Sequence, residues 1–187
     1  MNQTRTKVVI INGAPQSGKD TFAKLAIDYC NMDESANVLN LSSVDPIKDV
    51  LIGFGWDGEK SDNVRDIIAN IKQMWISAQN GPTMFMMNNI IHFHTQHVEE
   101  DNIVFCHIRE PEEIDKLKKI ITGMEAVGIE IITLFLIRGD NVVNDGVRDS
   151  DNPDLISKYP YDKIIYNDED LAKLDEKVCS FIDELLK

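Results

Sequence analysis

Apolar positions along the chain follow two alternating patterns, short unbroken runs and longer stretches with helical spacing. Five short runs rich in Val, Ile and Leu predict strands at Lys7–Ile11, Val38–Leu41, Asn102–His107, Ile129–Ile137 and Lys163–Tyr166. Apolar residues three or four positions apart predict helices at Lys19–Tyr29, Asp45–Phe54, Thr83–His97, Glu112–Met124 and Asp170–Leu186. Strands that alternate with helices indicate an α/β fold, a five-stranded parallel sheet with helices on both faces.

Two longer segments interrupt this alternation. One, at about residues 55–100, lacks strand signals, and its stripe of Val64, Ile67, Ile68, Ile71 and Trp75 predicts a helix with this apolar face toward the protein. The other, at about residues 139–161, is polar and rich in Asp and Asn. Long loops in a compact domain are usually functional or mobile. We therefore expect one domain over residues 1–187, with a helical insertion and a lid-like loop.

Composition and charge limit the classes of partner. The chain has 187 residues, 43% of them hydrophobic and 27% charged, as in ordinary globular proteins. Its net charge of −13 repels nucleic acid, and no basic cluster offsets it. We expect no membrane span either, because no apolar run approaches the ~20 residues required. The absence of a secretion signal and of paired cysteines predicts a cytoplasmic protein.

One motif carries specific chemistry. The residues between the first strand and the first helix are Gly13-Ala14-Pro15-Gln16-Ser17-Gly18-Lys19-Asp20-Thr21. They have the GxxxxGK spacing of a phosphate-binding loop (P-loop), in the strand–loop–helix context that the motif requires. The backbone N–H groups of such a loop point at phosphate oxygens, and its lysine reaches the β- and γ-phosphates. The motif therefore predicts a P-loop NTPase fold that binds ATP through Gly13, Ala14 and Gln16 to Thr21.

Asp20 occupies the position where P-loops normally carry a hydroxyl that ligates Mg²⁺. A carboxylate can hold Mg²⁺ directly or through water, so we expect Asp20 to be the metal-binding residue and Mg²⁺ to accompany ATP. A plainer interpretation of the loop is a glycine-rich turn followed by an acidic residue that suits the helix dipole. The strand before the loop and the helix after it favour phosphate binding.

Other classes of P-loop protein fit less well. Guanine-binding switch proteins need NKxD and DxxG motifs, which the sequence lacks. Helicases and motor ATPases are usually larger. The size of the chain and its helical insertion favour a kinase of small metabolites, whose partners would be small-molecule nucleotide substrates.

Several segments resemble the deoxynucleoside monophosphate kinases of phages and bacteria, which are adenylate-kinase-like P-loop kinases. The GKDT ending of the loop is similar to theirs. So are four segments that follow in the same order: Ser43–Asp49 (A-D-P-[IL]-K in that family), Asn63–Asp66, His107–Glu113 (D-x-R-x-P-N-E) and Tyr161–Asp168 (F-D-x-x-I-x-N). The resemblance covers nearly the whole chain, but only the P-loop is specific when taken alone.

The resemblance implies transfer of the γ-phosphoryl group of ATP to a (deoxy)nucleoside monophosphate. The catalytic side chains would be those of Lys19, Arg109 and Arg138. The acceptor would be bound by Asp45, Lys48, Arg65 and Arg109, and its phosphate by the two arginines of this set. Arg138 and Arg148 would be lid-type arginines that close on the donor.

Some alternatives remain open. His107 stands where the family has an Asp that helps to order Mg²⁺, which leaves room for a nucleotide-binding protein without turnover. A kinase of dephospho-coenzyme A or phosphomevalonate is also open, because the GKD ending recurs among the latter. Arg65 could equally be a solvated surface side chain, and Arg148 could form only surface ion pairs. Asp45, as an N-cap before Pro46, is sufficiently explained as a helix start.

Overall fold

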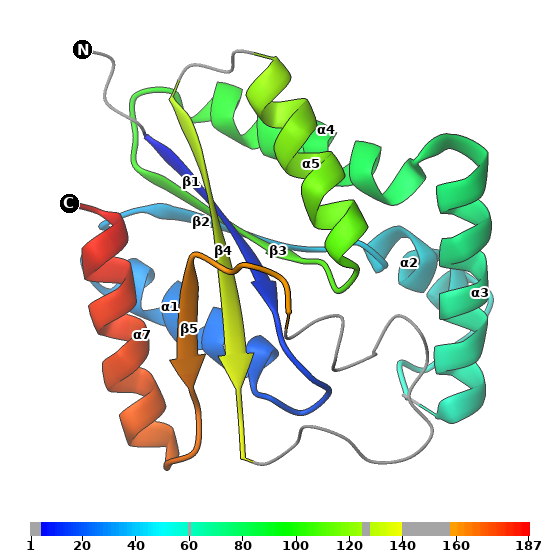
Figure 1. The fold of residues 1–187 in the computed structure, drawn as a ribbon, viewed down its shortest axis with the longest axis horizontal. Helices are drawn as coiled ribbons and strands as arrows, with labels where there is room; N and C mark the ends of the chain where they lie inside the picture. The colour runs from blue at the N-terminus through cyan, green and yellow to red at the C-terminus, as the bar shows by residue number, and fades with distance from the viewer. Residues whose placement is uncertain (1–4, 60, 125–127, 140–157) are drawn as a thin grey trace.

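The fold is built around one parallel sheet. The computed structural model describes residues 5–59, 61–124, 128–139 and 158–187. All paired strands run parallel, in the order β2-β3-β1-β4-β5 (Figure 1). Their bounds are β1 Thr6–Asn12, β2 Asn37–Ser42, β3 Asn102–His107, β4 Ile129–Ile137 and β5 Lys163–Tyr166. The predicted α/β class and its five-stranded parallel sheet are confirmed.

Helices cover both faces of the sheet. Helices α1 (Lys19–Asp33) and α7 (Leu171–Leu185) lie on one face, and α4 (Gly81–Gln96) and α5 (Pro111–Gly123) lie on the other (Figure 1). Successive residues of a strand point to opposite faces. In β1, Val9 and Ile11 therefore pack under α1 and α7, whereas Val8 and Ile10 pack under α4 and α5. This explains why β1 is an unbroken apolar run rather than an alternating one.

Three helices lie between β2 and β3 in the described residues, and the predicted insertion at about residues 55–100 holds the last two of them. Helix α2 spans Asp45–Gly53, α3 spans Asp62–Gln79, and α4 follows at once. Asn80, with φ +50°, both ends α3 and precedes α4. Pro82 lies inside the first turn of α4, where its missing N–H is not needed, so α4 begins two residues before the predicted start. None of the helices within the described residues combines the length and apolarity needed to cross a membrane.

The inner face of α3 differs from the predicted one. Ile67 and Ile71 were predicted to face the protein, but they are 46% and 37% exposed. Lys72 is instead only 6% exposed. A lysine is rarely buried unless it is paired, and the partner of Lys72 is Glu110, which precedes α5. The apolar stripe of a helix cannot reveal such a partner. The predicted face is therefore wrong at Ile67 and Ile71, whereas Val64, Ile68 and Trp75 are half-buried.

Candidate active site

The loop with the GxxxxGK spacing follows the central strand β1. Strands β2 and β3 lie on one side of β1, and β4 and β5 lie on the other. All strands are parallel, so their carboxyl ends lie at one edge. β1 stands between β3 and β4, and the loop that follows β1 leads into α1. In open α/β sheets, ligands bind outside the carboxyl ends of the strands at such a switch point. The fold thus brings the predicted phosphate loop to the favoured ligand edge.

Two positions in this loop require glycine. Gly13 has φ +151° and Gly18 has φ +96°, a conformation that residues with a Cβ rarely adopt. A Cβ at position 13 would lie 2.4 Å from the carbonyl oxygen of Leu136. A Cβ at position 18 would lie 2.5 Å from Nδ2 of Asn167. The loop therefore packs tightly against residues at the ends of β4 and β5.

Gln16 adopts the same left-handed region without being glycine. Its φ is +63°, and its side chain is exposed at the loop. A non-glycine residue in this region costs about 1–2 kcal/mol.

Lys19 folds back over the loop. Its Nζ donates to the carbonyl oxygens of Gly13 (2.6 Å) and Ala14 (2.8 Å) and lies 3.4 Å from Oγ of Ser17. Helix α1 begins at Lys19, and its N-cap residue is Gly18, which has no side chain to cap the first turn. The N–H groups at the start of a helix and an ammonium group are the kinds of donor that bind anions. The exposed Asp20 side chain lies in the same turn.

Two buried amides hold the loop, and sequence reasoning named neither as a site residue. Asn12, with no exposed surface, accepts from the Gly13 N–H at 2.7 Å. Asn167, 5% exposed, donates from Nδ2 to the carbonyl oxygen of Ser17 at 2.9 Å. Buried amides are rarely left unpaired. One sequence signal could have found them, because each asparagine stands where a predicted strand ends. Asn167 is also the last residue of the segment that resembles F-D-x-x-I-x-N.

His107 ends β3 beside the loop. It is half-buried, and its Nε2 lies 2.9 Å from Oδ1 of Asn40. Burial lowers the pKa of His107 to about 4, and the nearby charges of Lys19 and Lys48 act in the same direction. The carboxylate of Asp20 opposes them. His107 is therefore neutral at pH 7, and it lies where the starts of α1 and α2 meet the end of β3.

Asp45 and Lys48 form an ion pair at the start of α2. Their Oδ1 and Nζ atoms are 2.7 Å apart. Oδ2 of Asp45 accepts from the backbone N–H of Ser42 at 2.6 Å. Asp45 was predicted as the N-cap, but the N-cap is Val44 and Asp45 is the first residue of the helix. The prediction was wrong because the carboxylate bonds backward to the end of β2 rather than forward into the helix.

The predicted arginines have different surroundings. Arg109 follows β3 directly, with its carbonyl oxygen 2.8 Å from Nδ2 of Asn12. Arg65 lies in the first turn of α3, 52% exposed, with NH1 3.3 Å from Oδ1 of Asp62. Arg138 is exposed just after β4, at the same sheet edge as Arg109. Arg148 lies outside the described residues.

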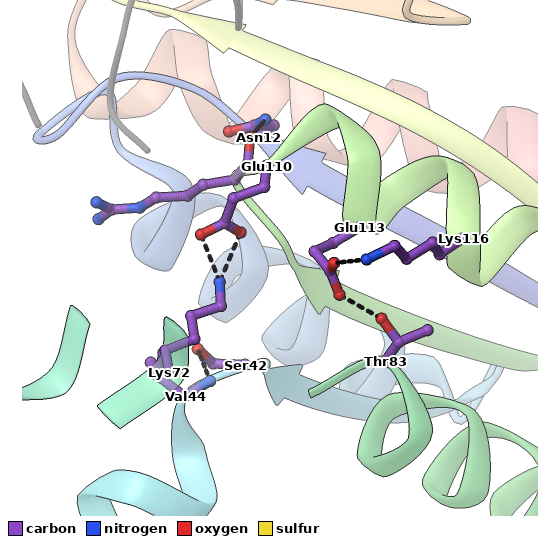
Figure 2. A network of polar contacts seen from close by, with 9 residues as sticks. Asn12, Ser42, Val44, Lys72, Thr83, Glu110, Glu113 and Lys116 are labelled. Carbon is purple, nitrogen blue, oxygen red and sulfur yellow. Dashed lines mark hydrogen bonds and ion pairs between the residues drawn. The ribbon is translucent and has the colours of Figure 1, made fainter. Parts of the chain in front are cut away.

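A polar network that the sequence did not reveal adjoins Arg109. Figure 2 shows Lys72 of α3 pointing at both carboxylate oxygens of Glu110, at 2.7 and 2.5 Å. Beside this pair, Glu113 of α5 binds Lys116 on its own helix and Thr83 of α4 (Figure 2). The network borders a narrow cleft lined by Ser43, Lys72, Pro82, Thr83, Met86, Ile108 and Glu113. Sequence reasoning missed Lys72 because lysines on helices are usually solvated.

Comparisons with known proteins identify the fold. No protein-family profile matches the chain, and no curated protein matches it. The solved structure of the APS kinase of Mycobacterium tuberculosis, in complex with AMPPNP and APS, is similar to it with a TM-score of 0.51, at 16% identity over 98% of this chain and 99% of that chain. A gluconokinase from Sinorhizobium meliloti 1021 matches at 12% identity over 98% and 95% of the two chains, with a TM-score of 0.48.

A shikimate kinase from Bacteroides thetaiotaomicron matches at 16% identity over 96% and 97% of the two chains, with a TM-score of 0.46. At these identities the likeness concerns the fold alone, and of these three structures the APS kinase complex has a TM-score above 0.5. The chain has the fold of the P-loop kinases. The more specific resemblance to deoxynucleoside monophosphate kinases stays a prediction.

Proposed function

We propose that this chain transfers the γ-phosphoryl group of ATP to a small phosphorylated acceptor, a (deoxy)nucleoside monophosphate. The main support is that the phosphate loop and Arg109 lie at the same edge of the sheet. The Gly13–Lys19 loop follows β1, and Arg109 follows the neighbouring strand β3. The net charge of −13 makes local cations necessary for any bound phosphate. A cationic site on each of two adjacent strands suits a donor and an acceptor that must meet.

The roles follow from charge and position. Lys19 would exchange its loop carbonyls for the β- and γ-phosphates of ATP, which are stronger acceptors. Arg109 would hold the acceptor phosphate, because a guanidinium group can grip a phosphate with two hydrogen bonds. Arg138, exposed after β4, would neutralise charge on the transferred group. Phosphoryl transfer depends mainly on such positioning and neutralisation.

Three further residues complete the proposed acceptor site. Lys48 would reach the acceptor by leaving its ion pair with Asp45, which itself stays anchored to the Ser42 N–H. Arg65 lies on the same side of α3 as Lys72, seven residues earlier and thus about 10 Å along the helix axis. Its 52% exposure leaves it free to turn toward a ligand at the cost of a weak surface ion pair. Arg148 stays a proposed lid residue.

Mg²⁺ would enter with ATP rather than occupy a site of its own. Among the described residues, no group of three or more His, Cys, Asp or Glu side chains could hold a metal. Asp20, exposed in the first turn of α1, would supply the single protein carboxylate, and phosphate oxygens would complete the coordination. When bound, the ion would neutralise charge on the phosphates.

Two other functions compete with this one. A kinase of another phosphorylated metabolite, of the dephospho-coenzyme A or phosphomevalonate type, would use the same loop and a similar cationic site. A nucleotide-binding protein without turnover is favoured by one observation, the neutral His107 at the position where the deoxynucleoside monophosphate kinases that the sequence resembles carry an acid. If a missing acid limits turnover, His107→Asp should raise it. No change would mean that Asp20, or another group, already serves the metal.

The test is an ADP-release assay with ATP, Mg²⁺ and a panel of nucleoside and deoxynucleoside monophosphates, with dephospho-coenzyme A and phosphomevalonate as competing acceptors. We expect acceptor-dependent ADP release with one or more monophosphates. ADP release only with the other two acceptors would assign the chain to a different kinase class. Tight ATP binding without turnover on any acceptor would favour the non-catalytic alternative.

Variants separate the two sites. Lys19→Ala should abolish turnover, whereas Arg109→Ala should raise the KM for the acceptor about 10- to 100-fold, the loss of one or two charged hydrogen bonds. The KM for ATP should change much less in Arg109→Ala. Lys119→Ala, at an exposed position of α5, serves as the control for loss of a surface cation. An equal rise in the KM for ATP and the KM for the acceptor in Arg109→Ala would refute the assignment of Arg109 to the acceptor.

A further inference from the structure

We propose that Lys72 and Asn12 are positioning residues that couple the helical insertion at about residues 55–100, which would contact the acceptor, to the phosphate loop. They hold the Arg109–Glu110 turn from two sides, Lys72 from α3 and Asn12 from β1. This inference rests on the proposed function, because the coupling is defined between a nucleotide on the loop and an acceptor at the insertion. It adds two residues that touch neither substrate.

The first half of the link is the ion pair between α3 and the turn. Nζ of Lys72 lies 2.7 and 2.5 Å from the two carboxylate oxygens of Glu110 (Figure 2). The two side chains are only 7% and 16% exposed. A buried pair is strongly destabilised when one partner is lost, because the other charge is left in a poor solvent. Movement of α3 away from this turn is therefore opposed, and the two elements are expected to move together.

The second half is the buried amide of Asn12. Its Nδ2 donates to the carbonyl oxygen of Arg109 at 2.8 Å, and its Oδ1 accepts from the Gly13 N–H at 2.7 Å. One side chain thus joins the residue that begins the phosphate loop to the residue proposed to hold the acceptor. The other Nδ2 hydrogen bond goes to the hydroxyl of Tyr161, at 2.8 Å, so the amide cannot turn without losing several partners.

Together these contacts form an unbroken path from α3 to the loop. It runs from Lys72 through the Glu110 carboxylate and the Arg109 backbone to Asn12 and then to Gly13. Glu110 is also the N-cap of α5, which anchors the turn on the sheet. A displacement of α3 by a bound acceptor would reach the loop along this path. Because coupling between two sites is reciprocal, a nucleotide on the loop would in turn tighten acceptor binding by the same factor.

The neighbouring ion pair provides a matched control. Lys116 and Glu113 are 2.6 Å apart, and the carboxylate is similarly buried, at 6% exposed. Both residues belong to α5, and the further partner of Glu113 is Thr83 of α4. This pair joins the same two kinds of charged group beside the path, with Lys116 41% exposed where Lys72 is 7% exposed. The hydrogen bonds of Glu113 to Lys116 and Thr83 involve neither Glu110 nor the phosphate loop.

The experiment measures coupling directly. The Kd of AMPPNP is determined by calorimetry with and without a saturating mixture of dAMP, dCMP, dGMP and dTMP, and the ratio is the coupling factor. We expect a factor of about 5–50 in the wild type, within the usual range for coupled sites. In Lys72→Met it should fall to below about 2, while the Kd of AMPPNP alone stays within about 2-fold of wild type. Lys72→Arg should retain the coupling, and so should Lys116→Met.

Controls exclude a merely structural effect. Lys72→Met/Glu110→Gln removes both charges, so it avoids an unpaired buried carboxylate and should still lack coupling. Asn12→Asp keeps the acceptor for the Gly13 N–H but loses the donor to Arg109, and it should lower the factor as well. A factor unchanged in Lys72→Met, or reduced equally in Lys116→Met, would overturn the inference.

The inference and the proposed function can fail separately. Wild-type turnover on a monophosphate with a coupling factor of 1 would overturn the coupling while leaving the kinase proposal intact. Coupling without turnover on any acceptor would support the path and refute the kinase. Absence of monophosphate binding would overturn both.

Discussion

The contact between Gly18 and Asn167 offers a sharp test of how the phosphate loop is built. Gly18 has φ +96°, and a Cβ there would lie 2.5 Å from Nδ2 of Asn167. The same nitrogen donates to the carbonyl oxygen of Ser17 at 2.9 Å, and Asn167 is 5% exposed. One amide thus both restricts position 18 and holds the residue before it. The perturbation is Gly18→Ala, Asn167→Ala and the double variant.

The expected free energies of unfolding follow from these contacts. Asn167→Ala leaves a buried carbonyl without its partner and should cost about 1–3 kcal/mol. Gly18→Ala should cost about 1–2 kcal/mol for its left-handed backbone and a further 1–3 kcal/mol or so for overpacking against the amide. In the double variant the opposing amide is gone, so the overpacking cost disappears. The double variant should therefore be more stable than the sum of the single effects predicts, by about 1–3 kcal/mol.

The assay is urea unfolding of all four proteins, with the Kd of ATP measured in parallel. Each single variant should also weaken ATP binding, because the loop N–H groups lose their orientation. Gly55→Ala is the matched control: Gly55 has φ +95°, but a Cβ there would meet nothing within 4 Å. It should show the backbone cost alone and should combine additively with Asn167→Ala. If Gly18→Ala and Asn167→Ala were also additive, Asn167 would not pack against the loop as described.

Two further predictions concern pH. Burial holds the pKa of His107 near 4, below its ordinary value of 6.5, so the unfolded chain binds more protons between these values. Stability should thus be complete above pH 6.5 and fall by about 2–3 kcal/mol toward pH 4, and unfolding curves of His107→Gln should lack this loss. Asp162 behaves differently: burial alone would raise its pKa, but the hydrogen bonds that its carboxylate accepts from Thr133, at 2.8 and 2.7 Å, lower it. Asp162→Asn should cost about 1 kcal/mol at pH 7, and this difference should vanish as the pH falls through the lowered pKa, whereas a difference that is constant from pH 7 to pH 3 would contradict the role of the charge.

Much of the fold was predictable because its signals are local. The runs at β3 and β4 predicted those strands with the observed bounds, and the spacing of Gly13, Gly18 and Lys19 predicted the phosphate loop. A strand buried on both faces has to be apolar along its whole length, and a P-loop needs its glycines and lysine within a few consecutive residues. Both requirements are met inside a short window of sequence.

The supporting residues of the site were decided only by the tertiary structure. Asn12 meets Arg109 across 97 residues, Asn167 meets Ser17 across 150, and Lys72 meets Glu110 across 38. No periodicity or spacing joins such positions. The burial of Lys72 in α3 was missed for the same reason, since a buried charge is stabilised by a partner that the helix does not contain. Local patterns in the sequence were enough to predict the strands, the helices and the phosphate loop. The polar contacts that orient this loop exist only where strand ends from distant parts of the chain meet at one edge of the sheet.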